Sequence, residues 1–131
     1  MNKLLWVLQV TVALAFLAHG LLLLFPSADV AARMYETFPQ WFWLALGVAE
    51  LAAAVGLTVP GWTGILPWLV PYAALGVMIV MVSATVYHLQ RGETSSAGVT
   101  LVLLAMATTI AFLRWRVFPI RSRPTTVTVG A

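Results

Sequence analysis

A single carboxylate, Glu50, lies inside an otherwise apolar stretch of the chain, residues 41–59 (WFWLALGVAELAAAVGLTV). Holding a charge at the centre of a bilayer costs roughly 3 kcal/mol on insertion scales, so acidic residues are rare there and usually have a function. A buried carboxyl group that keeps its proton is an acid, and we therefore interpret Glu50 as a candidate proton donor.

Two histidines are the candidate partners of this acid. His19 and His88 lie in two other apolar stretches, and helical rise places both in the same half of the membrane as Glu50. A neutral histidine accepts and relays protons, so Glu50 and His19 together could protonate an olefin, an epoxide or a quinone oxygen. The alternative for this pair is a hydrogen bond that only fixes helix packing.

Metal and thiol chemistry are not expected. Two histidines and one carboxylate match the ligand set of some non-haem iron sites, but no single helix carries two of them at ligand spacing. The absence of cysteine excludes thiolate ligands, disulfides and dithiol chemistry by this chain. No cofactor-binding motif is identifiable, and a quinone is the cofactor class compatible with the pattern.

A semi-polar stripe runs along the third apolar segment. Its members follow one another by four, three, four and four residues, which keeps them on one side of a helix: Tyr72, Gly76, Ile79, Ser83 and Tyr87. Such a stripe either bonds neighbouring helices together or forms the wall of a ligand cavity. In the second interpretation the catalytic candidates are Glu50 and His19, and the ligand-binding candidates are His88, Tyr87, Ser83 and Tyr72.

The composition identifies the class of protein. Of 131 residues, 62% are hydrophobic and 8% are charged, so a soluble domain of this size could not bury its apolar surface. The seven basic residues are few and mostly near the ends, and nucleic-acid binding is not expected. We therefore expect an integral membrane protein whose first partner is the lipid bilayer.

Four apolar segments are long enough to cross roughly 30 Å of hydrocarbon as helices. They comprise residues 4–25, 41–59, 65–87 and 97–113. Pro26 follows the first segment, and Pro60 with Gly61 is predicted to end the second. The sequence thus predicts an all-α fold, a four-transmembrane-helix bundle in residues 1–116, followed by a basic and disordered tail in residues 117–131.

Basic residues predict the orientation of this bundle. The side that holds both termini carries Lys3, Arg114, Arg116, Arg121 and Arg123, whereas the opposite side carries Arg33 and Arg91. Lysine and arginine accumulate on the cytoplasmic side, so the N and C termini are predicted to be cytoplasmic in a multi-pass protein of the cell membrane. The C-terminal arginines are interpreted as anchors at the anionic membrane surface.

The connection at residues 27–40 is predicted to form a short amphipathic helix on the outer surface. Ser27 is a suitable N-cap, and Val30, Met34 and Phe38 share one helix face. Such a helix is either a lid over a cavity or a plain anchor at the membrane interface.

Four short motifs stand out along these segments. They are FLAHG at 16–20, FPQW at 38–41, LGVAEL at 46–51 with AVGL at 54–57, and SATVYH at 83–88. In type and order they resemble the DoxX-like family of small four-helix integral membrane proteins, whose second helix carries a glycine-x-x-glutamate signature. The resemblance covers residues 4–116 and implies a four-helix membrane fold.

One position departs from the family pattern. Many relatives carry a lysine shortly after the glycine of the first motif, where this chain has Leu22 and Leu23. His19 would then replace that lysine as the partner of Glu50. The resemblance implies an association with quinone-linked oxidoreductase complexes or with receptor-assembly chaperoning, and similar membrane folds include sterol isomerases that use buried acids.

Two functional hypotheses follow. In the first, the protein binds a lipophilic small molecule of the quinone or isoprenoid type in a pocket within the bundle. It then performs isomerisation, cyclisation or epoxide opening, or forms the membrane part of a quinone-linked oxidoreductase. In the second, it is a non-catalytic accessory or assembly subunit, and the small residues Ala45, Ala49 and Ala53 dock a membrane or peripheral protein partner. Whether the chain is an enzyme stays open.

Overall fold

The computed structural model describes residues 2–124, and within them every regular element is a helix. The helices are α1 (Asn2–Leu24), α2 (Ala28–Tyr35), α3 (Gln40–Thr63), α4 (Leu69–Gln90) and α5 (Thr94–Phe112), which continues into the π-helical turn η1 (Leu113–Val117). Four of them, with η1 included in the last, are long and apolar enough to cross a membrane. The predicted all-α fold with four spans is confirmed.

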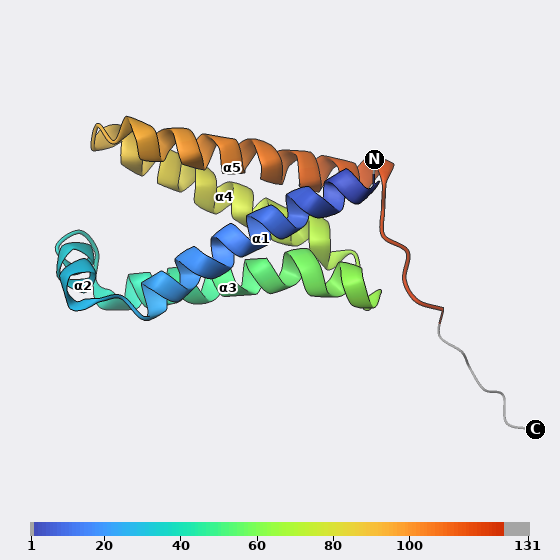
Figure 1. Ribbon diagram of the computed structural model, residues 1–131, viewed down its shortest axis with the longest axis horizontal. Coiled ribbons are helices and arrows are strands. Elements are labelled where there is room, and N and C mark those ends of the chain that lie inside the picture. The colour runs from blue at the N-terminus through green and yellow to red at the C-terminus, as the bar shows by residue number, and fades with distance from the viewer. Residues whose placement is uncertain (1, 125–131) are drawn as a thin grey trace, which may run out of the picture.

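The four long helices form an antiparallel bundle with two distinct ends (Figure 1). The terminal end holds the start of α1, the end of α5 and the α3–α4 connection. The loop end holds α2 and the α4–α5 turn. Helices α1 and α3 pack as one pair and α4 and α5 as another, while α1 and α5 approach each other at the terminal end and diverge toward the loop end.

The third helix runs past the predicted stop. The prediction that Pro60 and Gly61 end it is wrong, because α3 continues to Thr63 with Pro60 inside it. A proline removes one backbone hydrogen-bond donor from the helix, and in α3 this loss alone does not end the helix. The helix ends at Gly64, whose positive φ of 71° and N–H donation to the carbonyl of Pro60 at 3.0 Å form a glycine cap.

Helix α2 confirms the short helix expected in the first connection, and it is fastened to the start of α3. The indole Nε1 of Trp43 donates to the carbonyl of Met34 at 2.9 Å, and the rings of Phe38 and Phe42 stack at 4.5 Å. Ser27 occupies the N-cap position, although its side chain makes no capping hydrogen bond. The fastening places α2 over the loop end of the bundle.

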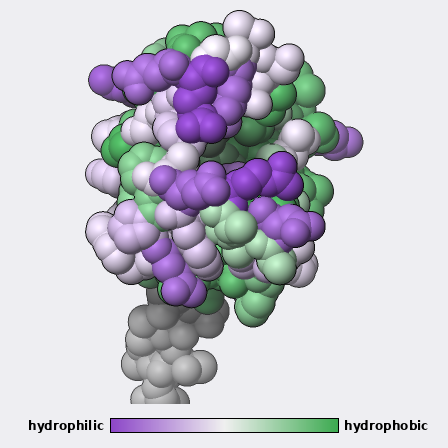
Figure 2. All heavy atoms as spheres, turned by 90° about the vertical axis from the view of Figure 1, so that its left-hand side faces the viewer, coloured by the Kyte–Doolittle hydropathy of each residue, from purple (hydrophilic) through white to green (hydrophobic). Residues whose placement is uncertain are grey.

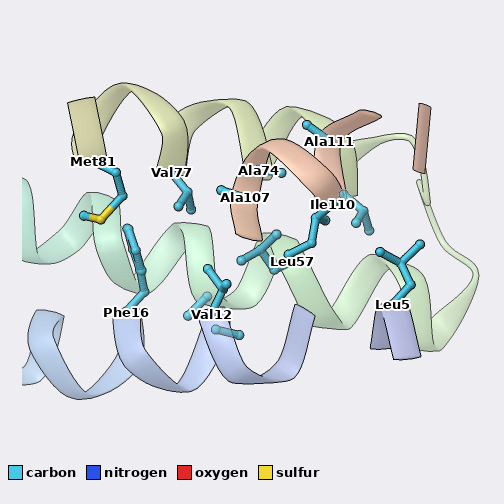
Figure 3. Close-up of a cluster of buried hydrophobic side chains, with 13 residues drawn as sticks. Leu5, Val12, Phe16, Leu57, Ala74, Val77, Met81, Ala107, Ile110 and Ala111 are labelled. Atoms are coloured by element: carbon cyan, nitrogen blue, oxygen red, sulfur yellow. The ribbon is translucent and has the colours of Figure 1, made fainter. Parts of the chain in front are cut away.

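The core lies where all four long helices come together. Figure 3 shows side chains from each of them directed into one space: Val12 and Phe16 of α1, Leu57 of α3, Val77 and Met81 of α4, and Ala107 and Ile110 of α5. Lipid tails are as apolar as these residues, so close packing rather than exclusion from water holds membrane helices together. The stability of the core therefore depends on how closely these side chains pack against one another.

The closest helix contact joins α1 to α3 through two glycines. A Cβ placed on Gly20 would lie 3.1 Å from the carbonyl oxygen of Gly47 and 3.2 Å from Cβ of Glu50. A Cβ placed on Gly47 would lie 3.1 Å from the carbonyl oxygen of Gly20. Small residues permit such an approach of two backbones. Glu50 is thereby brought against α1.

The chain after η1 turns back along the end of α3. The backbone N–H of Arg123 donates to the carbonyl of Gly64 at 3.1 Å, and Ile120 lies close to Gly61. Phe118 and Ile120 also pack against the core. Residues 118–124 of the predicted tail therefore contact the bundle, whereas 125–131 lie outside the described residues and their disorder stays a prediction.

We expect Gly20→Val to push α1 away from α3, because the new side chain would overlap the carbonyl of Gly47. Overpacking of a close contact lowers the free energy of unfolding by about 1–3 kcal/mol. The measurement is the thermal unfolding midpoint in detergent. Gly98→Val is the control, since a Cβ at Gly98 meets nothing within 4 Å. Equal midpoints for the two variants would contradict the close contact of α1 with α3.

Candidate functional site

Glu50 lies on the buried stripe of α3. Gly47, Glu50, Ala54 and Leu57 follow one another at the three- and four-residue spacing of one helix face, and all four are buried. The side chain of Glu50 is 2% exposed. The acid therefore faces into the bundle.

His19 is the partner of Glu50. Its Nδ1 lies 2.7 Å from Oε2 of Glu50, and among the described residues this is the one side-chain hydrogen bond of the carboxyl group. One proton lies between the two atoms, so the bond fixes the orientation of the imidazole ring. The second ring nitrogen, Nε2, is thereby directed away from Glu50, and it makes no hydrogen bond to residues 2–124.

The exposure of His19 contrasts with the burial of its neighbours on the same face of α1. His19 is seven residues beyond Val12 and fourteen beyond Leu5, so the three share nearly one face of α1. Leu5 is 1% and Val12 0% exposed, whereas the His19 side chain is 57% exposed. Leu23, about one turn beyond His19 toward the loop end, is again only 4% exposed, so His19 is a local exposed point on a face that is otherwise buried. His19 therefore joins a buried acid to the surroundings of the bundle.

His88 does not join this pair. Its Nδ1 lies 2.6 Å from Oε2 of Glu93, and Nε of Arg91 donates to the other oxygen of Glu93 at 2.9 Å. The Tyr87 ring lies 5.5 Å from the His88 ring and 5.3 Å from the Arg91 guanidinium. Seen from the loop end, hydrophilic side chains gather over the α4–α5 turn and separately over α2, with apolar side chains between them (Figure 2). A local network thus occupies His88.

The other ligand-binding candidates also lie apart from Glu50. Ser83 is exposed, and its hydroxyl donates to the carbonyl of Ile79 on its own helix at 3.0 Å. Tyr72 is at the terminal end, with its ring 5.7 Å from Trp68 and 5.5 Å from Trp115. The structure thus brings together only His19 and Glu50 of the six candidates, and ligand binding by the other four stays a prediction.

An apolar groove of about 270 Å³ lies between α3 and α4, and its lining includes neighbours of the pair along the chain but neither His19 nor Glu50. Ala49 and Ala53 of α3 line it together with Gly76 of α4 and Phe16 of α1. Phe16 is three residues from His19 on α1, and Ala49 precedes Glu50 on α3. The small side chains of α3 leave this space open. Within residues 2–124, no group of three or more histidine, aspartate or glutamate side chains could hold a metal ion.

Sequence reasoning missed a second polar cluster, at the terminal end. Gln9 is fully buried, its Nε2 donates to the carbonyl of Leu57 at 2.7 Å, and its Oε1 accepts from Nε of Arg114. Arg114 is 3% exposed, so its interpretation as a surface anchor is wrong. The overlooked signal is Gln9 itself, an amide within an apolar span that needs partners inside the protein.

A comparison with models of protein families identifies the family of this chain. The family model described as the DoxX-like family matches residues 7–110, which is most of the chain. No curated protein and no solved structure matches the chain.

A double-mutant cycle tests the bond between His19 and Glu50. We expect His19→Ala to lower the free energy of unfolding by about 3 kcal/mol, because it leaves a buried acid unpaired. Glu50→Gln should cost about 1 kcal/mol, because the amide still bonds to the ring. The double variant should cost less than the sum, since residues in contact are energetically coupled. Strictly additive losses, measured by unfolding in detergent, would show that the pair is not coupled.

Acid is expected to weaken the loop-end network. The Arg91 guanidinium, and after it the His88 ring, hydrogen-bonds to Glu93 and holds the pKa of this carboxyl below its usual value of 4.5. The resulting stabilisation is complete above pH 4.5 and is lost as the pH falls through the lower folded-state pKa. Between about pH 6 and about pH 3, thermal stability should fall further in the wild type than in Glu93→Gln. Glu36→Gln, at an exposed position, is the control, and parallel curves for all three proteins would contradict the expectation.

Proposed function

This chain belongs to the DoxX-like family of membrane proteins, and on that premise we propose that it binds a lipophilic small molecule of the quinone or isoprenoid type at His19. The observation that carries the proposal is a histidine 57% exposed within a membrane-spanning helix, held at 2.7 Å by a buried carboxyl group. A polar ring facing lipid is unfavourable unless a polar group of a ligand or partner meets it.

The pair is suited to proton exchange with such a ligand. When His19 is neutral and its Nδ1–H donates to Glu50, Nε2 accepts a proton from a ligand hydroxyl. The imidazolium that results is stabilised by the carboxylate, which carries the opposite charge. In the reverse direction the imidazolium donates its Nε2 proton to a carbonyl or olefin. Either direction fits isomerisation, cyclisation or epoxide opening, and equally the protonation of a quinone oxygen.

The apolar groove supports binding of the remainder of the ligand. Phe16 lies within one helical turn of His19 and also lines the groove between α3 and α4. An apolar chain or ring system packed against Phe16 would place a polar head group near Nε2. Ligand sites in helix bundles commonly combine an apolar wall with a few fixed polar groups.

A second candidate function rests on the outward face of α3. Ala45 and Ala49 are exposed, and Ala49 and Ala53 border the apolar groove. Small exposed residues at four-residue spacing permit close approach of another transmembrane helix. In this reading the protein is an accessory subunit, the groove seats a partner helix, and the His19–Glu50 bond only holds α1 to α3.

Native mass spectrometry of the full chain, purified in mild detergent, separates the two functions. We expect a stoichiometric lipophilic adduct on the wild type, its loss in His19→Ala, and about tenfold weaker binding in Glu50→Gln, since one charge-assisted hydrogen bond accounts for a factor of this size. Glu36→Gln should keep the adduct. An adduct unchanged in His19→Ala, or an empty wild type, would contradict ligand binding at His19. A protein partner lost in Ala49→Leu would then favour the accessory subunit.

A further inference from the structure

The terminal end of the bundle contains a buried cation with no anionic partner among residues 2–124. Arg114 is 3% exposed, and uncharged groups alone hold its guanidinium. Nε donates to Oε1 of Gln9, and Nη1 donates to Oδ1 of Asn2 at 2.8 Å and to the carbonyl of Phe118 at 3.3 Å. Nη2 is buried without a hydrogen-bond partner in this part of the chain.

This arrangement leaves a charge uncompensated. Removing a cation from water is costly unless an opposite charge accompanies it, and neutral hydrogen-bond acceptors recover only part of that cost. The ion pairs of the described residues are His19–Glu50, His88–Glu93 and Arg91–Glu93, and none includes Arg114. The missing counter-charge is therefore expected from outside residues 2–124.

A cavity of about 310 Å³ adjoins this cation. Its lining includes Arg114 and a second cation, Arg121, together with Trp6 and Phe118. The Trp6 ring lies 5.4 Å from the Arg114 guanidinium and supports it from one side. The segment after η1 forms a wall of the cavity, and the bond from Arg123 N–H to the carbonyl of Gly64 at 3.1 Å ties this segment to α3. The cavity is thus built from both ends of the chain.

We propose that this cavity binds a phosphate group. Nη2 of Arg114 carries protons that no described residue accepts, and a phosphate has enough oxygens to accept from Nη2 and from the exposed Arg121 guanidinium together. The cavity lies where the membrane-spanning helices end, at the level of lipid head groups. Trp6 and Phe118 offer apolar surface to the glycerol and acyl parts of a phospholipid. A membrane phospholipid and a soluble phosphate compound both carry the required group.

Arg121→Gln is the test variant, because Arg121 is exposed and its loss leaves the packing around Gln9 intact. Arg116→Gln is the matched control, since Arg116 is exposed nearby, carries the same charge and does not line the cavity. The full chain, freed of lipid in detergent, is titrated in native mass spectrometry with phosphatidylglycerol and with diacylglycerol of the same acyl chains. Inorganic phosphate is added separately in thermal unfolding.

One phosphatidylglycerol should bind the wild type and Arg116→Gln, and its binding to Arg121→Gln should be about tenfold weaker, as expected for one lost charge-assisted contact. Diacylglycerol, which offers no phosphate to either arginine, should bind the wild type more weakly still. This result identifies a phospholipid as the source. Stabilisation of the wild type and of Arg116→Gln by inorganic phosphate, absent in Arg121→Gln, identifies a soluble source. Equal binding of phosphatidylglycerol to the two arginine variants would overturn the proposal. So would equal binding of the two lipids to the wild type without stabilisation by inorganic phosphate, or the absence of both lipid binding and stabilisation by phosphate.

Discussion

A polar side chain inside a bilayer has no water to bond to, so it must find its partner within the protein, and this constraint organises the bundle. Glu50 meets it through His19 at 2.7 Å. That distance requires α1 and α3 to lie close together, which Gly20 and Gly47 permit because neither carries a Cβ. The acid, its partner and the glycines between the helices therefore form one unit. Removing any of them disturbs the others.

Other buried polar groups join the remaining helices in the same way. The hydroxyl groups of Thr85 and Thr100 lie 2.7 Å apart and connect α4 to α5. Gln9 connects α1 to the carbonyl of Leu57 in α3 and to Arg114 beyond α5. This last connection is at the terminal end, so α1 and α5 are fastened there and diverge toward the loop end (Figure 1). The cavity proposed to bind phosphate lies at this fastened end, whereas the His19–Glu50 pair lies farther toward the loop end. The two proposals therefore concern different parts of the bundle and are independent.

Membership of the DoxX-like family does not decide between a ligand-binding protein and an accessory subunit. The chain has leucine where many relatives are expected to carry a lysine after the first helical glycine, and the structure shows His19 bonded to the acid of the second motif. A histidine differs from a lysine in having a second nitrogen that can take up or release a proton near neutral pH. The prediction that His19 replaces that lysine therefore implies a change in the chemistry available at this position.

The sequence by itself determined the number of spans, the short helix at the loop end and the inward position of Glu50, because hydropathy and helical periodicity are local properties of a chain. It also favoured His19 as the partner of Glu50 and placed His88 nearer the end of the bundle. Only the tertiary structure showed that His19 and Glu50 touch and that Glu93 holds His88, since this depends on which helices approach closely. For the same reason Arg114 could not be recognised as buried. Its position after an apolar segment is that of a surface anchor, and only the packing of α1 against the end of α5 encloses it.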